Sequence, residues 1–196
     1  MRKSLYFIPL AAFLGLAVFL FSGLFSDPHL HENARLEQPM PAFALADLTD
    51  PSKTITEKDL LGQPYLLNVW GVWCPTCNAE LGFLTSLRAQ GVKIVGLYYN
   101  QPTDSAFGES FDLPSLQRDV AKKLAEQGDP YQFNILDKER SLIFDLGVTG
   151  APETFIVDAK GKIRHHMVGD INPSNWPALN AIYQQLQQEA SQGATP

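Results

Sequence analysis

The chain contains two cysteines, and both stand in one short segment, Cys74-Pro75-Thr76-Cys77. A disulfide between them would close so short a loop that it adds only about 2 kcal/mol of stability in the chain-entropy model. As reactive groups they are better placed, because a thiol at the start of a helix lies beside unpaired N–H groups that stabilise its thiolate. Pro75 suits the first helical turn, and Cys77 is close enough to Cys74 to resolve a mixed disulfide formed there. The spacing therefore predicts a redox-active pair in which Cys74 attacks disulfides.

Three other roles for the cysteine pair remain open. One is half of a zinc site, but zinc needs four ligands and the chain has no second pair of cysteines. His165 and His166 could complete such a site, although neighbouring residues on a strand point to opposite faces of a sheet. The others are a structural disulfide and a peroxide-reducing cysteine, for which no supporting threonine stands upstream of Cys74. We favour thiol–disulfide exchange, with no metal and no cofactor, because the disulfide itself carries the electrons.

The segments around the cysteines predict a strand, a helix and a second strand. Residues 65–70 form a nearly continuous apolar run, as expected of a central strand covered on both faces. Residues 75–90 carry leucines at helical spacing and end at Gly91, which suits a helix cap. Residues 92–99 form another apolar run. The cysteines are thus expected between a buried strand and a helix N-terminus, the position that their chemistry requires.

The rest of the chain alternates in the same way and predicts one α/β domain. Further strands are expected over residues 42–48, 54–56, 133–136, 154–157 and 162–168, and further helices over residues 115–127, 139–146 and 172–189. The last two strands flank a turn and form an antiparallel hairpin beside parallel central strands, which gives a mixed sheet. The first strand is expected at the edge of this sheet, paired with the second in a hairpin. Residues 100–114 form a long connection whose role the sequence does not assign.

An apolar segment precedes the domain. Residues 5–25 contain no charged side chain, and a helix of that length spans about 31 Å, close to the thickness of a bilayer core. Arg2 and Lys3 lie before it and Asp27 after it, so the positive-inside rule keeps the N-terminus cytoplasmic and exports the remainder. A cleaved signal peptide would have a shorter apolar core and a small-residue cleavage site, which residues 21–26 match poorly. We expect an uncleaved signal anchor.

The composition predicts one ordinary domain after the anchor. Of the 196 residues, 45% are hydrophobic and 18% are charged, which supports a packed core. The formal net charge of −6 argues against a partner that is a nucleic acid. We divide the chain into a cytoplasmic N-terminus (1–4), a transmembrane anchor (5–25), a linker (26–39), the folded domain (40–190) and a flexible tail (191–196).

Two motifs relate the chain to a known family. Residues 66–77 (LLNVWGVWCPTC), followed by residues 150–155 (GAPETF), resemble thioredoxin-fold proteins. More narrowly, they resemble the membrane-tethered thiol:disulfide interchange proteins of cytochrome c maturation, called CcmG or DsbE. Residues 169–173 also match the family's entry into its last helix, and the resemblance extends over residues 36–186. It implies a thioredoxin fold, with a central mixed sheet flanked by helices and an N-terminal β-hairpin extension, after one transmembrane helix.

The resemblance implies roles for the residues of both motifs. Cys74 matches the attacking cysteine and Cys77 the resolving one, so the two form the redox disulfide. Pro152 matches the cis-proline that faces the disulfide, and the Ala151–Pro152 bond would present backbone groups to an extended substrate strand. We expect the substrate to be contacted by Trp73, Pro75, Thr76 and Ala151.

The resemblance also implies roles for two acids. Glu80 lies one helical turn after Cys77, Glu153 follows the proline, and both match acidic residues of the family. Asn68 stands where ordinary thioredoxins keep a buried aspartate that can deprotonate the resolving cysteine. Either Glu80 or Glu153 must then accept that proton, if any side chain does. We expect partial burial to raise the pKa of at least one of them.

A function follows from the resemblance. The chain would be an oxidoreductase of the inner membrane, with its domain in the periplasm, that reduces the disulfide of the apocytochrome c CxxCH segment or of a CcmH-type assembly partner before haem attachment. A DsbD- or CcdA-type membrane protein would return electrons to it. Direction does not follow from the cysteine motif, because reductants and oxidants share it and differ in potential. Two alternatives remain: a tethered reductant of other exported proteins, such as copper-site assembly factors, and a non-enzymatic adaptor in cytochrome assembly.

Overall fold

The N-terminal part of the chain forms a unit of its own. The structure is a computed structural model that describes residues 7–24, 35–101 and 111–193. It separates residues 1–34 from residues 35–196. In the first unit, helix α1 covers Phe7–Leu24. No helix among the described residues combines the length and the apolar character that a membrane span requires.

Several expectations concern residues outside the described ranges, and they stay predictions. They are the cytoplasmic N-terminus at residues 1–4, both ends of the apolar segment at 5–25, most of the linker at 26–39, the centre of the connection at 100–114 and the last residues of the tail at 191–196.

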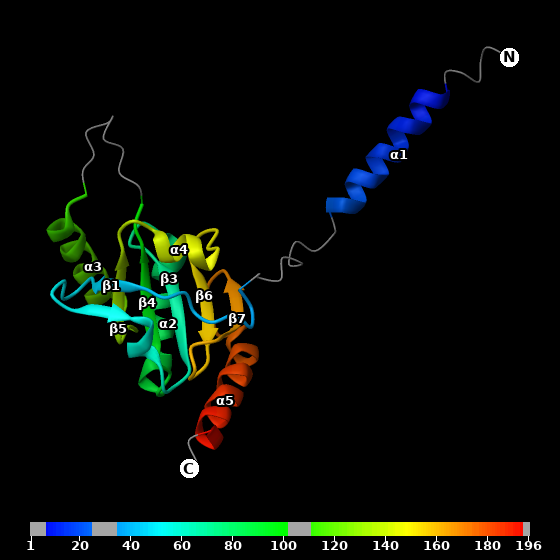
Figure 1. Cartoon of the computed structure of the whole chain (residues 1–196). Coiled ribbons are helices and arrows are strands. Elements are labelled where there is room, and N and C mark those ends of the chain that lie inside the picture. Colours follow the sequence, from blue (N-terminus) through cyan, green and yellow to red (C-terminus); the bar gives the residue numbers. More distant parts are fainter. Residues whose placement is uncertain (1–6, 25–34, 102–110, 194–196) are drawn as a thin grey trace. The chain divides into compact units, whose positions relative to one another are not determined.

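The second unit is built around one seven-stranded sheet. Its strands are β1 (Ala44–Asp47), β2 (Thr54–Thr56), β3 (Tyr65–Trp70), β4 (Ile94–Tyr99), β5 (Phe133–Asp137), β6 (Glu153–Val157) and β7 (Ile163–Val168). Their order across the sheet is β2-β1-β5-β4-β3-β6-β7 (Figure 1). The central strands β3, β4 and β5 are parallel, and every other neighbouring pair is antiparallel. The predicted mixed sheet with a final antiparallel hairpin is confirmed.

The hairpin of β1 and β2 is also confirmed, but the predicted place of its first strand is wrong. Leu45 of β1 lies opposite Ile55 of β2, and Asp47 of β1 lies opposite Ile135 of β5. The edge strand is therefore β2. Alternating hydrophobicity shows which face of a strand is buried, but it does not show whether one or two strands pair with it. For that reason the sequence did not reveal that β1 also pairs with β5.

Helices cover both faces of the sheet. They are the 3-10 helix η3 (Glu57–Leu60) and the α-helices α2 (Pro75–Ala89), α3 (Leu113–Gln127), α4 (Ser141–Leu146) and α5 (Trp176–Gly193). Buried side chains of α2, α3 and α5 pack with Leu66 and Trp70 of β3, whereas those of η3 and α4 pack with Leu67 and Val69. Because alternate residues of a strand point to opposite faces, these are the two faces of the sheet.

Strand β3 positions the cysteines. It is buried at every residue and lies between β4 and β6, and the cysteine loop follows it directly. The indole N–H of Trp70, its last residue, donates to Asn134 Oδ1 at 3.0 Å. Gly96 of β4 leaves room for this bond, because a Cβ there would lie 2.7 Å from Asn134 Oδ1. The end of β3 is therefore held by a side chain of β5 that reaches across β4.

The folded unit extends past both expected boundaries. The backbone N–H of Glu37 donates to the Ile163 carbonyl at 2.8 Å, and that of Met40 donates to the Gly161 carbonyl at 2.7 Å. Part of the expected linker is thus hydrogen-bonded to the start of β7. At the other end, α5 continues to Gly193, into the segment expected as a tail.

Candidate active site

Cys74 and Cys77 form a disulfide at the N-terminus of α2. Cys74 is the N-cap residue, and its sulfur accepts a hydrogen bond of 3.1 Å from the backbone N–H of Cys77. Pro75 occupies the first turn, as predicted. Cys74 is 3% exposed and Cys77 is 0% exposed, so an attacking or attacked group from outside meets the Cys74 sulfur. When the disulfide is open, the N-cap hydrogen bond and the helix terminus favour the thiolate at Cys74.

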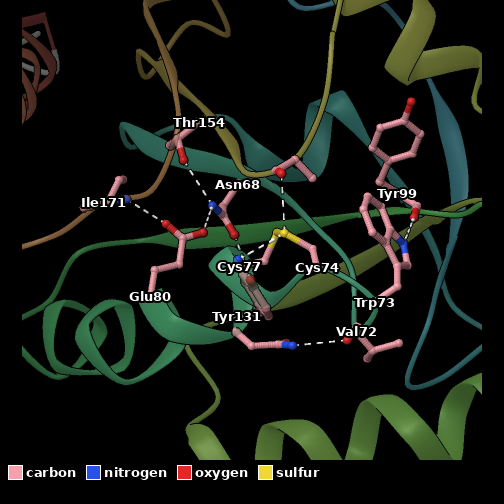
Figure 2. The surroundings of a disulfide bond; sticks show 12 residues. Asn68, Val72, Trp73, Cys74, Cys77, Glu80, Tyr99, Tyr131, Thr154 and Ile171 are labelled. Atoms are coloured by element: carbon pink, nitrogen blue, oxygen red, sulfur yellow. Dashed lines mark hydrogen bonds between the residues drawn. A yellow bond between two sulfur atoms is a disulfide. The ribbon is translucent and has the colours of Figure 1, made fainter.

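Exposed side chains border Cys74. Pro75 and Thr76 are exposed on the first turn of α2, and Trp73 is 38% exposed just before it. The Trp73 indole N–H donates to the Tyr99 carbonyl at 2.9 Å, and the two rings meet edge to face (Figure 2). Trp73 is thereby fixed against the end of β4. It offers an apolar surface beside the disulfide.

The loop before β6 meets the disulfide from the other side. The Ala151–Pro152 peptide bond is cis, as the resemblance implied. The Ala151 carbonyl oxygen lies 3.4 Å from Cys74 Sγ. A disulfide sulfur carries no hydrogen, so this is a close contact, but a reduced Cys74 thiol can donate to that carbonyl. The Pro152 carbonyl accepts from the Gly169 N–H at 2.9 Å, which ties the loop to the end of β7.

A buried hydrogen-bond network lies in the surroundings of the disulfide, with Asn68 of β3 at its centre (Figure 2). Asn68 Nδ2 donates to Glu80 Oε1 at 2.9 Å and to Thr154 Oγ1 at 3.1 Å. Asn68 Oδ1 accepts from the Tyr131 hydroxyl at 2.7 Å. The second Glu80 oxygen, Oε2, accepts from the backbone N–H of Ile171 at 2.7 Å. Side chains from α2, β6 and the loop before β5 therefore meet around the Asn68 amide.

Glu80 has the perturbed carboxyl that the sequence led us to expect. The residue is 2% exposed, and this burial raises the pKa of its carboxyl to about 7. The hydrogen bonds from Ile171 and Asn68 oppose the rise, whereas the negative charge of Asp170 adds to it. A carboxyl with a pKa near 7 can both accept and release a proton at neutral pH.

Glu153 is hydrogen-bonded to the cis-proline loop and lies close to His166, apart from the Asn68 network. Its Oε1 accepts from the N–H and hydroxyl of Thr149 and from the N–H of Gly150, at 2.6–2.9 Å. Its Oε2 lies 2.8 Å from His166 Nε2. Burial alone raises the pKa of Glu153, but the bonds from His166 and Thr149 outweigh it and leave the pKa below its ordinary value. Because Glu153 and Thr154 are neighbours on β6, Glu153 lies on the face of the sheet opposite to Asn68, where it anchors the cis-proline loop.

The structure thus assembles most of the expected residues and adds others. It gathers Cys74, Cys77, Glu80, Ala151 and Pro152, with Trp73, Pro75 and Thr76 at the rim. Glu153 reaches the site only through the loop that it holds.

Sequence reasoning did not find Tyr131. Its contact with Asn68 joins residues 63 positions apart, and no local motif marks it. It also did not anticipate the use of His166, which was considered only as a zinc ligand and instead pairs with Glu153. For His166 a signal existed, because adjacent strands of a predicted hairpin bring cross-strand side chains together.

Comparisons with known proteins identify relatives of nearly the whole chain. Residues 35–185 match the family model described as Redoxin. The thiol:disulfide interchange protein DsbE of Pseudomonas aeruginosa is 42% identical over 190 residues, which cover 96% of this chain and 98% of the relative. The DsbE proteins of Vibrio cholerae and Escherichia coli K12 are 40% and 36% identical, each over 98% of this chain and 100% of the relative.

The chain belongs to the DsbE family of thiol:disulfide interchange proteins. It is a thiol–disulfide oxidoreductase, and Cys74 and Cys77 are its cysteine pair.

Solved structures establish the thioredoxin fold. The crystal structure of a thiol:disulfide interchange protein of the thioredoxin family from Chlorobium tepidum superimposes with a TM-score of 0.56 at 23% identity, over 76% of this chain and 95% of that chain. StoA from Bacillus subtilis gives a TM-score of 0.52 at 20% identity, over 72% of this chain and 97% of that chain.

Proposed function

We propose that this DsbE-family protein is a periplasmic reductant in cytochrome c maturation. Its substrate is the disulfide of the apocytochrome c CxxCH segment, or of a CcmH-type assembly partner that carries it. A DsbD- or CcdA-type membrane protein reduces it again after each turnover. One observation carries the chemistry. Cys74 is the cysteine that a substrate can reach, and it lies between a helix N-terminus and the Ala151 carbonyl, whereas Cys77 is buried one helical turn from Glu80.

The proposed location rests on the N-terminal sequence. The uncharged run of residues 5–25 continues beyond both ends of α1 and follows Arg2 and Lys3. The alignments with DsbE relatives cover 98% of this chain, so they extend into this N-terminal segment. We propose that it is an uncleaved anchor in the inner membrane and that the domain from residue 35 onward is exported.

The first chemical step is an attack on the substrate. The Cys74 thiolate forms a new S–S bond to one substrate sulfur, and the substrate's own S–S bond breaks, releasing its other sulfur as a thiolate. The extended substrate segment pairs with the backbone beside Pro152, and Trp73, Pro75, Thr76 and Ala151 contact it. The hydrogen bond from Cys77 N–H stabilises the thiolate of Cys74 before the attack.

The second step releases the product. The Cys77 thiol gives its proton to the Glu80 carboxylate, and its thiolate attacks Cys74 Sγ. The Cys74–Cys77 disulfide forms, and the second substrate sulfur leaves as a thiolate that takes up a proton. The substrate has gained two electrons and the protein has lost two. We assign the proton transfer to Glu80 rather than to Glu153, because burial raises the pKa of Glu80 to about 7, whereas the pKa of Glu153 is lowered and its carboxyl lies on the opposite face of the sheet.

Trapping tests the proposal. In full-length Cys77→Ser expressed in its native host, a mixed disulfide at Cys74 cannot be resolved, so the client remains attached and can be identified by mass spectrometry. We expect apocytochrome c or its maturation partners, and the Cys74→Ser/Cys77→Ser double variant, which cannot attack, is the control. Capture of unrelated exported proteins would assign general thiol reduction, and no capture above the control would favour an adaptor.

The reductant direction has its own test. A reduction potential near the strongly oxidising value of DsbA, about −120 mV, would overturn it.

A further inference from the structure

Tyr131 belongs to the buried network but takes no part in the steps above. Its hydroxyl donates to Asn68 Oδ1 at 2.7 Å, the same distance as the bond that Glu80 accepts from Ile171. Tyr131 is 5% exposed, and its ring packs against Trp70 with centroids 5.0 Å apart. The hydroxyl is therefore held in place by the packing of the ring, and its partner is a side chain that touches Glu80.

The orientation of the Asn68 amide decides what Glu80 meets. An amide has an acceptor end and a donor end, and Tyr131 occupies the acceptor end. The donor end is thereby turned to Glu80 Oε1. A flipped amide would put its oxygen against the carboxyl group, an arrangement that repels the ionised form and suits only the protonated form.

We infer that Tyr131 is a positioning residue of the exchange reaction: by donating to Asn68 Oδ1, its hydroxyl favours the amide orientation in which an N–H faces the Glu80 carboxylate. The inference rests on the proposed role of Glu80 as proton acceptor for Cys77. Tyr131 acts on Glu80 indirectly, through Asn68. It favours the ionised carboxylate of Glu80, which is the form that can take up the proton.

The other groups around Glu80 act differently. Asp170, on the loop between β7 and α5, places a negative charge near Glu80 and favours its protonated form. Cys77 lies on the same helix, one turn before Glu80, and does not titrate while it is in the disulfide. The backbone N–H of Ile171 bonds the carboxylate whichever way the amide of Asn68 points. Thr154 Oγ1 accepts from the same Asn68 nitrogen at 3.1 Å and so supports the observed orientation of the amide.

The test uses Tyr131→Phe in the oxidised full-length protein, with the pKa of Glu80 read by carboxyl ¹³C NMR. Phenylalanine keeps the ring and removes the hydroxyl. We expect the pKa of Glu80 to rise by about one unit, since a hydrogen bond to a charged group commonly changes an equilibrium tenfold or more. The matched control is Tyr183→Phe, which removes another buried hydroxyl, bonded to Pro64 O and Lys93 N and outside this network. An unchanged pKa in Tyr131→Phe, or an equal rise in both variants, would overturn the inference.

A second variant covers a failure of Tyr131→Phe to fold. Asn68→Ala removes the amide through which Tyr131 acts, so the pKa of Glu80 must rise there at least as much, and an unchanged value refutes the inference. If both variants fold, adding Tyr131→Phe to Asn68→Ala must produce no further rise.

Kinetics separate this inference from the proposed relay. The rate at which Cys77 resolves a mixed disulfide at Cys74 is measured against pH, and its midpoint should move up by about one unit in Tyr131→Phe. If Glu80→Gln leaves the wild-type pH profile unchanged, the relay fails, while the NMR titration still decides whether Tyr131 governs Glu80. If Glu80→Gln abolishes the profile and Tyr131→Phe shifts neither readout, the relay stands and the inference about Tyr131 fails.

Discussion

Burial of Glu80 should make the oxidised protein less stable as the pH rises. In the unfolded chain this carboxyl has an ordinary pKa of 4.5, and in the folded protein burial raises the pKa to about 7. Below pH 4.5 both states carry the proton, so the contribution of Glu80 to stability is fully present. Between the two values only the folded state keeps the proton, and the stability falls with every step toward pH 7.

The size of the effect follows from the same two pKa values. Each pH unit between them is worth about 1.4 kcal/mol, so the full loss is about 3 kcal/mol, of which about 2.5 kcal/mol falls between pH 5 and pH 8. Glu80 is 2% exposed, and solvent therefore screens little of this penalty. The oxidised state suits the measurement, because neither cysteine titrates in it.

The assay compares the oxidised full-length protein with Glu80→Gln, which cannot ionise. Free energies of unfolding are measured in urea at several pH values from 5 to 8, and all other titrating groups cancel in the difference between the two proteins. We expect the free energy of unfolding of Glu80→Gln, relative to that of the wild type, to rise by about 2.5 kcal/mol from pH 5 to pH 8. A constant difference, within about 0.5 kcal/mol, would refute the reasoning that burial raises the pKa of Glu80.

Two further substitutions have clear expected outcomes. Gly96→Ala places a Cβ 2.7 Å from Asn134 Oδ1 and 3.0 Å from Trp70 Nε1. We expect this overpacking to lower the free energy of unfolding in urea by about 1–3 kcal/mol. A loss below about 0.5 kcal/mol would mean that the strands adjust freely. Glu153→Gln removes the charge that pairs with His166, and we expect the free energy of unfolding at pH 7 to fall by about 1–3 kcal/mol. Because the pKa of Glu153 is lowered, its contribution is present above the ordinary carboxyl range and is lost as the pH falls through the folded-state value. A deficit of the same size at pH 7 and pH 3 would contradict this.

Local patterns in the sequence determined the elements and the reactive pair. The apolar run of residues 65–70, the helix that begins at Pro75 and the cysteine spacing all depend on neighbours within a few positions. Periodicity and capping act at that range, so these features could be predicted from residues alone. The roles of Pro152 and Glu80 came from motif resemblance rather than from pattern.

Only the tertiary structure decided how the acids divide their tasks. Glu80 and Glu153 looked equivalent as sequence, but one carboxyl is enclosed beside Asn68 and the other is surrounded by donors on the opposite face of the sheet. Likewise, the bond between Tyr131 and Asn68 forms because β5 and β4 and then β4 and β3 pair in register. A pKa depends on which groups surround an atom in space, and packing sets those neighbours across long distances in the chain.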